Sequence, residues 1–344
     1  MKPKVEYLGI DIGGAHIKIV CLNIKKEVCY VGYKQCPLWK GIENLKREIK
    51  FINSLITNKN NKCCITMTGE LCDIFKNRRS GAKEIIKVCK LINCRKFYYT
   101  KLDEMFTSRP KFDEIISMNW HSIGKLSEKK VKNAILIDFG STTTDLICIK
   151  NGQMKYESSD DFGRINNSEL LYTGFMRTPL FAITPYINYI KKRIKLIPEN
   201  FSNTSDIYRI KKEIKKNFDI DNTLDNRSKT LESSMQRVSR SLGFDFKKED
   251  QRLIKKISEE ISNIQLKEIA KKIFEMMKTY GLKKNTSIII SGIGQDVLIN
   301  FLKSRKKTVL SLANFIKGRN RKLNKIATYH APALSIAILL ADSK

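Results

Sequence analysis

The 344-residue sequence has no apolar run of the roughly 18 residues that a membrane span needs, and its first residues lack the apolar core of a signal peptide. We therefore expect a cytoplasmic protein that makes no membrane contact.

None of the nine cysteines forms a Cys-x-x-Cys pair, and none follows Cys148, which excludes a disulfide framework and gives no sign of structural zinc. The three histidines, His16, His121 and His330, are far apart in sequence. The sequence alone therefore pairs none of them with a nucleophilic cysteine.

Acidic residues are scarce: 35 Asp and Glu stand against 65 Lys and Arg, which gives a formal net charge of +30. Such a charge is typical of proteins that bind nucleic acid or another anionic surface. However, no nucleic-acid-binding motif is present, and the aromatic residues lie within apolar runs instead of alternating with basic ones. We do not expect nucleic acid as the main partner, although a basic nucleic-acid-binding or assembly protein stays an alternative.

The length of the chain favours two domains, since domains typically have about 100–200 residues, and 42% apolar residues suffice for a core in each. We predict a two-lobed α/β protein, with a first lobe at residues 1–124 and a second at residues 133–344. Between residues 165 and 285 the sequence is lysine-rich and of helical pattern, and we interpret this part as a helical insertion in the second lobe.

Apolar runs predict strands, and apolar residues at helical spacing predict helices. Each lobe is expected to open with a three-strand meander. These strands are predicted at 5–12, 15–22 and 28–33 in the first lobe and at 135–139, 144–149 and 154–157 in the second. Further strands are predicted at 63–67, 96–99 and 287–291. Helices are predicted at 42–57, 82–92, 231–242, 253–277, 295–303 and 332–340, with one more holding Leu71, Ile74 and Phe75.

Two similar turns, one near the start of each lobe, place an acid and glycine between apolar runs. The first begins at Asp11 and the second at Asp138. Glycine lets a backbone approach a ligand closely, N–H and hydroxyl groups bind phosphate oxygens, and carboxylates hold Mg²⁺. We predict that both turns bind phosphate and that Asp11 and Asp138 are metal ligands and catalytic acids; two ordinary hairpins are the alternative. The predicted phosphate or substrate ligands of these turns are Gly13, Gly14, Lys18, Gly140, Ser141, Thr142 and Thr143.

Other candidates lie near predicted turns. Glu70 follows a buried strand and suits a general base or hydrogen-bond acceptor, and Arg78 suits an anion ligand; a capped helix start is the alternative. Arg177 lies in a loop between a glycine and a proline, where binding residues are common. Gly292 and Gly294 form a Gly-x-Gly turn after a strand, which is also typical of an ordinary strand-to-helix turn.

An acidic loop precedes the predicted helix 231–242. Asp225 in this loop, with Arg237 and Arg240 expected on one flank of the helix, suits a metal-diphosphate site. The alternative is an acid that merely complements the dipole at the helix start.

Together these motifs resemble a known superfamily. Paired acidic glycine turns at the starts of two meanders resemble those of the sugar kinases, heat-shock 70 proteins and actin. More specifically, the chain resembles the hydantoinase A/oxoprolinase-like proteins, in the branch of tetrahydromethanopterin-linked C1 transfer. The stretches that carry this resemblance are residues 9–18, 36–41, 67–73, 119–120, 137–145, 169–179, 225–245 and 331–333.

The resemblance implies an actin-like (ribonuclease H-like) fold and, in the methanofuran-biosynthesis branch, an ether-forming transferase. Its substrates would be a tyramine- or tyrosine-derived phenol and an (aminomethyl)furan-methyl diphosphate, with Mg²⁺ as the expected cofactor. The phenol, whose pKa is near 10, needs a base, and Asp138, Asp145 and Glu70 are the candidates in that order. An ATP-dependent hydantoinase-, oxoprolinase- or kinase-like enzyme is the alternative, so the use of ATP stays open, as does self-association into a homo-oligomer.

Overall fold

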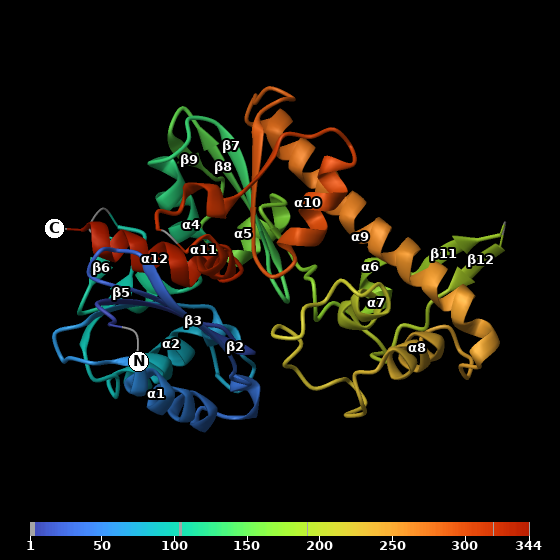
Figure 1. Ribbon diagram of the computed structural model, residues 1–344, viewed down its shortest axis with the longest axis horizontal. Coiled ribbons are helices and arrows are strands. Elements are labelled where there is room, and N and C mark those ends of the chain that lie inside the picture. Colours follow the sequence, from blue (N-terminus) through green and yellow to red (C-terminus); the bar gives the residue numbers. More distant parts are fainter. Residues whose placement is uncertain (1–3, 103–104, 191, 319, 344) are drawn as a thin grey trace. The chain divides into compact units, whose positions relative to one another are not determined.

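The computed structural model describes residues 4–102, 105–190, 192–318 and 320–343 (Figure 1). The chain divides into two compact units. Unit 1 comprises Met1–Asn133, Ile149–Met154 and Ser311–Lys344, and unit 2 comprises Ala134–Cys148 and Lys155–Leu310. The last segment therefore packs with the first unit, whereas the predicted second lobe extends to the C-terminus.

Unit 1 is built on a mixed sheet. Its strands are β1 (Tyr7–Ile12), β2 (His16–Leu22), β3 (Val28–Gln35), β4 (Lys62–Met67), β5 (Arg95–Tyr99) and β6 (Phe106–Thr107). They form a six-stranded sheet in the order β3-β2-β1-β4-β5-β6. β1 is antiparallel to β2 and parallel to β4, which is parallel to β5. A meander extended by parallel strands is the ribonuclease H-like arrangement that the sequence predicts.

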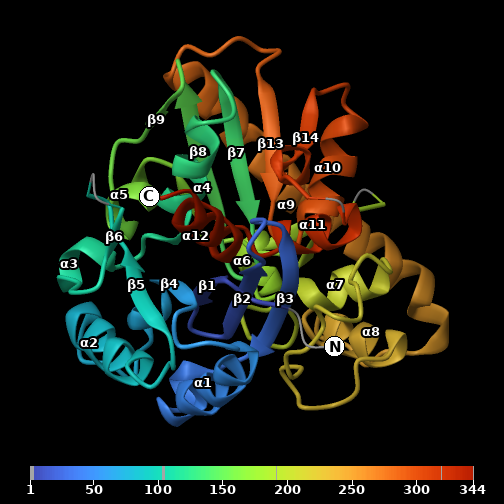
Figure 2. The same ribbon diagram turned by 60° about the vertical axis from the view of Figure 1, so that its left-hand side comes forward.

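Helices cover both faces of this sheet (Figure 2). They are η1 (Leu38–Lys40), α1 (Glu43–Leu55), η2 (Gly69–Leu71), α2 (Arg78–Cys89), α3 (Phe112–Ile115), α4 (Asn119–Glu128), η4 (Leu312–Phe315), α11 (Arg321–Thr328) and α12 (Ala331–Asp342). Alternate residues of β1 face opposite sides, as in any strand. Leu8, Ile10 and Ile12 pack with α1 and α2, whereas Gly9 lies against α12.

The second sheet repeats this layout. Its strands are β7 (Ala134–Phe139), β8 (Thr144–Lys150), β9 (Gln153–Lys155), β10 (Leu170–Leu171), β13 (Ser287–Ser291) and β14 (Val309–Ser311). Their order is β10-β8-β7-β13-β14, with β9 beside β8. β7 and β13 are parallel, as β1 and β4 are in unit 1. Asp11 and Asp138 therefore occupy equivalent places, each one residue before the end of a central strand.

The helices of unit 2 are α5 (Asp161–Asn166), α6 (Leu180–Ile183), α7 (Thr204–Ile210), α8 (Leu231–Arg240), η3 (Lys248–Asp250), α9 (Gln251–Thr279) and α10 (Gln295–Lys303). α9 has 29 residues and buries an isoleucine stripe that includes Ile254, Ile257 and Ile261. The predicted insertion is not wholly helical, because it also contains a hairpin of β11 (Tyr186–Tyr189) and β12 (Lys192–Lys195).

The helix predicted to hold Leu71, Ile74 and Phe75 is wrong. A single 3₁₀ turn, η2, stands there, and a new helix begins at Arg78. This helix is the one predicted at 82–92. Asn77 accepts a hydrogen bond from the Ser80 N–H and caps the helix, which therefore begins four residues earlier than the apolar spacing indicates. All nine cysteines are free thiols. Over the residues that the structure describes, every helix is too short or too polar to cross a bilayer.

The contact of β1 with α12 generates a first prediction. A Cβ atom at Gly9 would lie 1.9 Å from the Ala333 carbonyl oxygen, so Gly9→Ala must push α12 away from the sheet. We expect this substitution to reduce the free energy of unfolding by about 1–3 kcal/mol in denaturant titrations. The control is Lys25→Ala, since Lys25 is exposed in the turn between β2 and β3 and its loss should leave stability unchanged. Unchanged stability of Gly9→Ala would contradict the close packing.

Candidate functional site

The acid of the first turn is deeply buried. Asp11 is 0% exposed, and its Oδ2 accepts a hydrogen bond from Lys18 Nζ at 2.7 Å. Its other oxygen, Oδ1, has no hydrogen-bond partner among the described residues. Thr66, which lies beside Asp11 on the parallel strand β4, also has a buried hydroxyl without a partner there. A buried polar atom left unpaired is costly, so these two oxygens point to a ligand that the protein alone does not supply.

Two further loops close on the glycine turn of unit 1. Gly13 donates its N–H to the His16 carbonyl, and Thr68 donates its N–H to the Ile12 carbonyl, so the segment after β4 is joined to the end of β1. A Cβ atom at Gly69 would lie 3.2 Å from the Gly13 oxygen. The structure thus brings together the turn that contains Gly13 and Gly14 and the segment that leads to Glu70.

Glu70 is buried in this segment. Its Oε1 accepts hydrogen bonds from the Ser117 N–H at 2.9 Å and the Ser117 hydroxyl at 3.0 Å. Ser117 has a φ of +53°, an uncommon conformation for a residue other than glycine. This arrangement fixes Glu70 as an acceptor. Arg78 lies further along, at the first residue of α2.

Aromatic rings and histidines lie beside the Asp11–Lys18 pair. The rings of His16 and Tyr33 are 4.6 Å apart, and those of Tyr33 and His330 are 5.0 Å apart. Burial, together with the nearby Lys18 and His16, lowers the pKa of His330 to about 3. Sequence reasoning missed this stack, because 314 residues, from position 16 to position 330, separate its two histidines.

The acid of the second turn has a partner. Asp138 is 8% exposed, and its Oδ1 accepts a hydrogen bond from the Ser291 hydroxyl at 2.8 Å. Ser291 lies beside Asp138 on β13, as Thr66 lies beside Asp11 on β4. From the sequence, Ser291 was predicted only to lie in a strand. Its position directly before the Gly-x-Gly turn could have identified it as a site residue.

Two segments pack against the end of β7 and the loop that follows it, and the first contains Gly174 and Arg177. Phe175 donates its N–H to the Gly140 carbonyl, and Arg177 donates its N–H to the Ser141 carbonyl at 3.0 Å. A Cβ atom at Gly174 would lie 2.4 Å from the Ser141 oxygen, and only glycine, which has no Cβ atom, avoids this clash. The structure therefore brings Arg177 to the loop that carries Ser141, Thr142 and Thr143.

The Gly-x-Gly turn is the second of these segments. Gly294 donates its N–H to the Phe139 carbonyl at 2.9 Å. Added Cβ atoms would lie 2.4 Å from the Phe139 oxygen at Gly292 and 2.3 Å from the Phe139 ring at Gly294. Gly292 also has a φ of +87°. Both glycines are thus needed for close packing on the end of β7, at the residue that follows Asp138.

Asp145 lies in a different environment from Asp138. Its Oδ1 accepts a hydrogen bond from Arg164 at 2.8 Å, and both side chains are buried. Arg164 also donates to the Glu169 carbonyl. The buried guanidinium of Arg164 thus holds Asp145 inside unit 2.

Asp225 is surrounded by arginine. Its Oδ1 accepts hydrogen bonds from the Arg227 N–H at 3.1 Å and from Arg237 Nη1 at 3.0 Å, and its Oδ2 lies 3.6 Å from Arg240 Nη1. Arg237 is fully buried and also contacts Asp206 at 2.8 Å. These cations disfavour a further cation, so the arrangement suits an anion rather than a metal.

Mg²⁺ keeps several water ligands and takes one or two carboxylates together with substrate phosphate oxygens. The buried and unpaired Oδ1 of Asp11 fits such a ligand. Across the parts of the chain that the structure describes, no three His, Cys, Asp or Glu side chains gather closely enough to hold a metal. A Mg²⁺ ion at Asp11 would therefore take its remaining ligands from water and from a bound phosphate.

Known proteins of similar sequence match most of this chain. The family profile described as Hydantoinase/oxoprolinase matches residues 64–303. The (4-{4-[2-(gamma-L-glutamylamino)ethyl]phenoxymethyl}furan-2-yl)methanamine synthase of Methanocaldococcus jannaschii is 31% identical over 86% of this chain and 88% of its own length. The protein of the same name from Methanococcus vannielii is 32% identical over 63% of this chain and 95% of its own.

A solved structure with a similar fold is component A of (R)-2-hydroxyglutaryl-CoA dehydratase from Acidaminococcus fermentans. It has a TM-score of 0.46 and 13% identity, and the match covers 98% of this chain and 99% of that one.

The buried His330 predicts a dependence of stability on pH. The unfolded chain binds a proton on this ring below the ordinary pKa of 6.5, whereas the folded chain does so only near 3, so folding stability falls as pH drops through this window. Between pH 7 and pH 5 we expect wild type to lose about 2 kcal/mol more unfolding free energy than His330→Phe. Denaturant titrations at both pH values measure this difference, and equal losses would show that His330 is protonated in the folded state.

Proposed function

Because this chain belongs to the hydantoinase/oxoprolinase family and is similar over 86% of its length to a furan-methanamine synthase, we propose that it is an ether-forming transferase. The phenol would be γ-glutamyltyramine, and the electrophile would be an (aminomethyl)furan-methyl diphosphate. The similarity to two synthases that share one name is the observation that carries this proposal. Such a product belongs to methanofuran biosynthesis and hence to one-carbon metabolism.

In the proposed reaction the phenol oxygen forms a bond to the furan-bound CH₂ group. The bond between this carbon and the diphosphate oxygen breaks, and diphosphate departs with the electron pair. The phenol proton passes to a base. A furan stabilises positive charge at its CH₂ group. The largest increase in rate therefore comes from stabilising the negative charge that develops on the leaving diphosphate in the transition state.

The loop between β7 and β8 supports the binding of that leaving group. Ser141, Thr142 and Thr143 offer hydroxyl donors, and Arg177 is held beside Ser141 by its backbone N–H. We propose that these residues bind the diphosphate, because a guanidinium and several hydroxyls complement its oxygens. Donors fixed before the reaction lower the barrier without reorganisation during it.

Asp138 is our preferred base for the phenol proton. It lies near the end of β7, directly before the proposed diphosphate loop, whereas Asp145 is held by the buried Arg164. Glu70 already accepts two hydrogen bonds from Ser117 and ranks after Asp138. In unit 1, we propose that Asp11 and Lys18 also bind phosphate, Lys18 directly and Asp11 through Mg²⁺, which would supply positive charge to the phosphate oxygens.

The proposed function predicts product without nucleotide. Purified protein with Mg²⁺, γ-glutamyltyramine and the furan-methyl diphosphate should release diphosphate and form the ether, as measured by a phosphate-coupled assay and mass spectrometry. Absence of product until ATP is added, with ADP formed in proportion, would instead support the ATP-dependent members of the family.

In this assay Asp11→Asn and Asp138→Asn should each lower the rate by at least about tenfold, the effect of losing about 1.4 kcal/mol of transition-state stabilisation. Asp113→Asn is the matched control, since Asp113 is exposed in the first turn of α3 and should keep the wild-type rate. Wild-type rates in both buried-acid variants would show that these acids only support the fold.

A further inference from the structure

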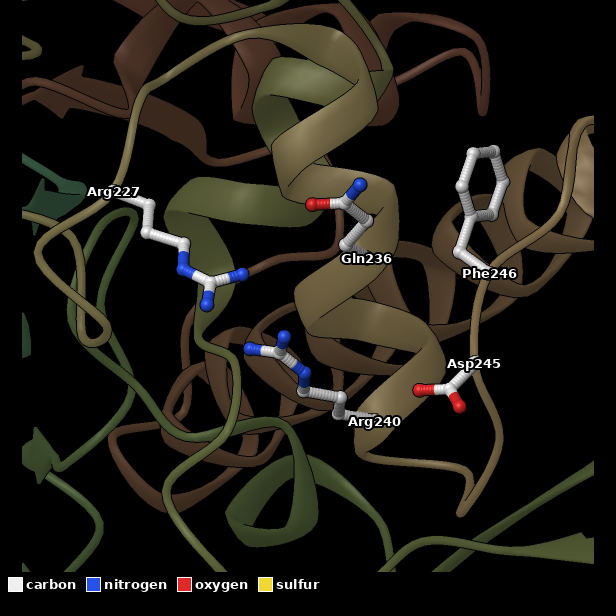
Figure 3. Close-up of a pocket in the computed structure, with 5 residues that line it drawn as sticks. All are labelled: Arg227, Gln236, Arg240, Asp245 and Phe246. Atoms are coloured by element: carbon white, nitrogen blue, oxygen red, sulfur yellow. The ribbon is translucent and has the colours of Figure 1, made fainter.

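A small pocket lies beside α8 in unit 2, and its volume is about 150 Å³ (Figure 3). It is lined by Arg227 from the loop before α8, by Gln236 and Arg240 of α8, and by Asp245 and Phe246 of the segment after it. Figure 3 shows the guanidinium groups of Arg227 and Arg240 pointing toward each other. Two cations, one carboxylate, one amide and one aromatic ring therefore surround a single cavity.

Most of these polar groups lack a partner within the protein. Among the described residues, the Arg227 guanidinium, the Gln236 amide and the Asp245 carboxylate make no hydrogen bond or ion pair. Arg240 makes one long ion pair, with Asp225 Oδ2 at 3.6 Å. Because Asp245 pairs with neither arginine, the charges of this pocket do not neutralise each other and are free to contact a ligand.

The helix that carries the pocket is held firmly. Arg237 is fully buried on α8, where it contacts Asp206 at 2.8 Å and Asp225 at 3.0 Å. Asp225 is also the partner of Arg240, so the same network positions one of the two pocket arginines. A side chain placed in advance loses less conformational freedom when it binds.

The chemistry of the pocket selects among anionic ligands. A pair of guanidinium groups matches a carboxylate, whereas Asp245 repels a second negative charge and matches an ammonium group. Phe246 offers apolar surface for methylene groups. A molecule with carboxylate and ammonium on one carbon, an α-amino acid end, meets all three requirements, while inorganic diphosphate meets only the first.

The size of the pocket limits it to part of a substrate. Pockets for complete drug-sized ligands typically have about 300–1,000 Å³, more than the about 150 Å³ found here. We propose that this pocket binds the α-amino acid end of the γ-glutamyl group of the phenol substrate. The choice of ligand rests on the function proposed above, because only that substrate supplies a γ-glutamyl group.

The pocket is connected to the proposed diphosphate loop within unit 2. Gly174 packs on Ser141, and Thr204, the first residue of α7, donates its hydroxyl to the Gly174 carbonyl at 3.1 Å. Two residues further along α7, Asp206 holds Arg237 of α8. The pocket proposed for one end of the phenol substrate and the loop proposed for the diphosphate of the furan substrate therefore belong to one hydrogen-bonded framework.

The test compares two phenols, γ-glutamyltyramine and tyramine, which lacks the amino acid end. For Arg227→Gln and Arg240→Gln we expect KM for γ-glutamyltyramine to rise roughly ten- to hundredfold, the loss typical of a charge-assisted hydrogen bond. The kcat values and the KM for tyramine should stay within about twofold of wild type. Arg252→Gln is the control, since Arg252 is exposed on α9 and outside the pocket, and it should alter neither phenol. Equal effects of the pocket variants on both phenols, or no effect on either, would overturn the proposal.

A binding measurement separates this proposal from the reaction itself. Calorimetry with γ-glutamylmethylamide, which carries the amino acid end without a phenol, should show binding to the full-length wild type and at least tenfold weaker binding to Arg227→Gln. If no ether forms with either phenol but this difference is found, the proposed function fails and the pocket assignment holds. Equal binding to wild type and Arg227→Gln, or displacement of the probe by inorganic diphosphate alone, would overturn the assignment.

Discussion

The arrangement of unit 2 depends on how closely backbone segments approach the end of β7. At Gly292, Gly294 and Gly174 an added Cβ atom would lie within 2.4 Å of another atom, so each of these positions accepts only glycine without a backbone shift. These contacts hold the loop after Asp138 between two neighbouring segments and bring Arg177 to it. The donors proposed to bind diphosphate are therefore positioned by backbone packing before a ligand arrives.

The two units use the same strand order but differ in how they treat the equivalent acid. Both acids lie one residue before the end of a central strand and beside a hydroxyl residue of a parallel neighbour. Ser291 satisfies one oxygen of Asp138, whereas Asp11 pairs with Lys18 and keeps one oxygen without a partner among the described residues. We infer that the duplicated topology carries two different electrostatic environments around its equivalent acids.

Much of this fold could be predicted from the sequence, because strong local patterns matched the final structure. The helix predicted at 295–303 has these bounds as α10, and the long isoleucine-patterned helix is α9. The hairpin of β11 and β12 was missed, since its lysine-rich second strand is mostly exposed and shows no buried face. Helical spacing correctly placed Arg237 and Arg240 on one flank of α8, where both contact Asp225. The burial of Arg237 was not predictable, because it depends on Asp206, which is 31 residues away in sequence.

Residues of the candidate site could be predicted only where they lie close together in the sequence. Glycine, acid and hydroxyl residues within one turn identify both loops, whereas the stack of His16, Tyr33 and His330 depends on contacts between distant segments. The pocket of Arg227 and Arg240 likewise could not be predicted, because it forms where α8 and the loops on both sides of that helix come together.

A crystal structure of the protein with Mg²⁺ and inorganic diphosphate tests the central claim most directly. The account predicts diphosphate bound to the loop between β7 and β8, with its oxygens contacting Ser141, Thr142 or Thr143 and the Arg177 guanidinium. Diphosphate bound elsewhere, with that loop free of ligand at saturating concentration, would contradict it.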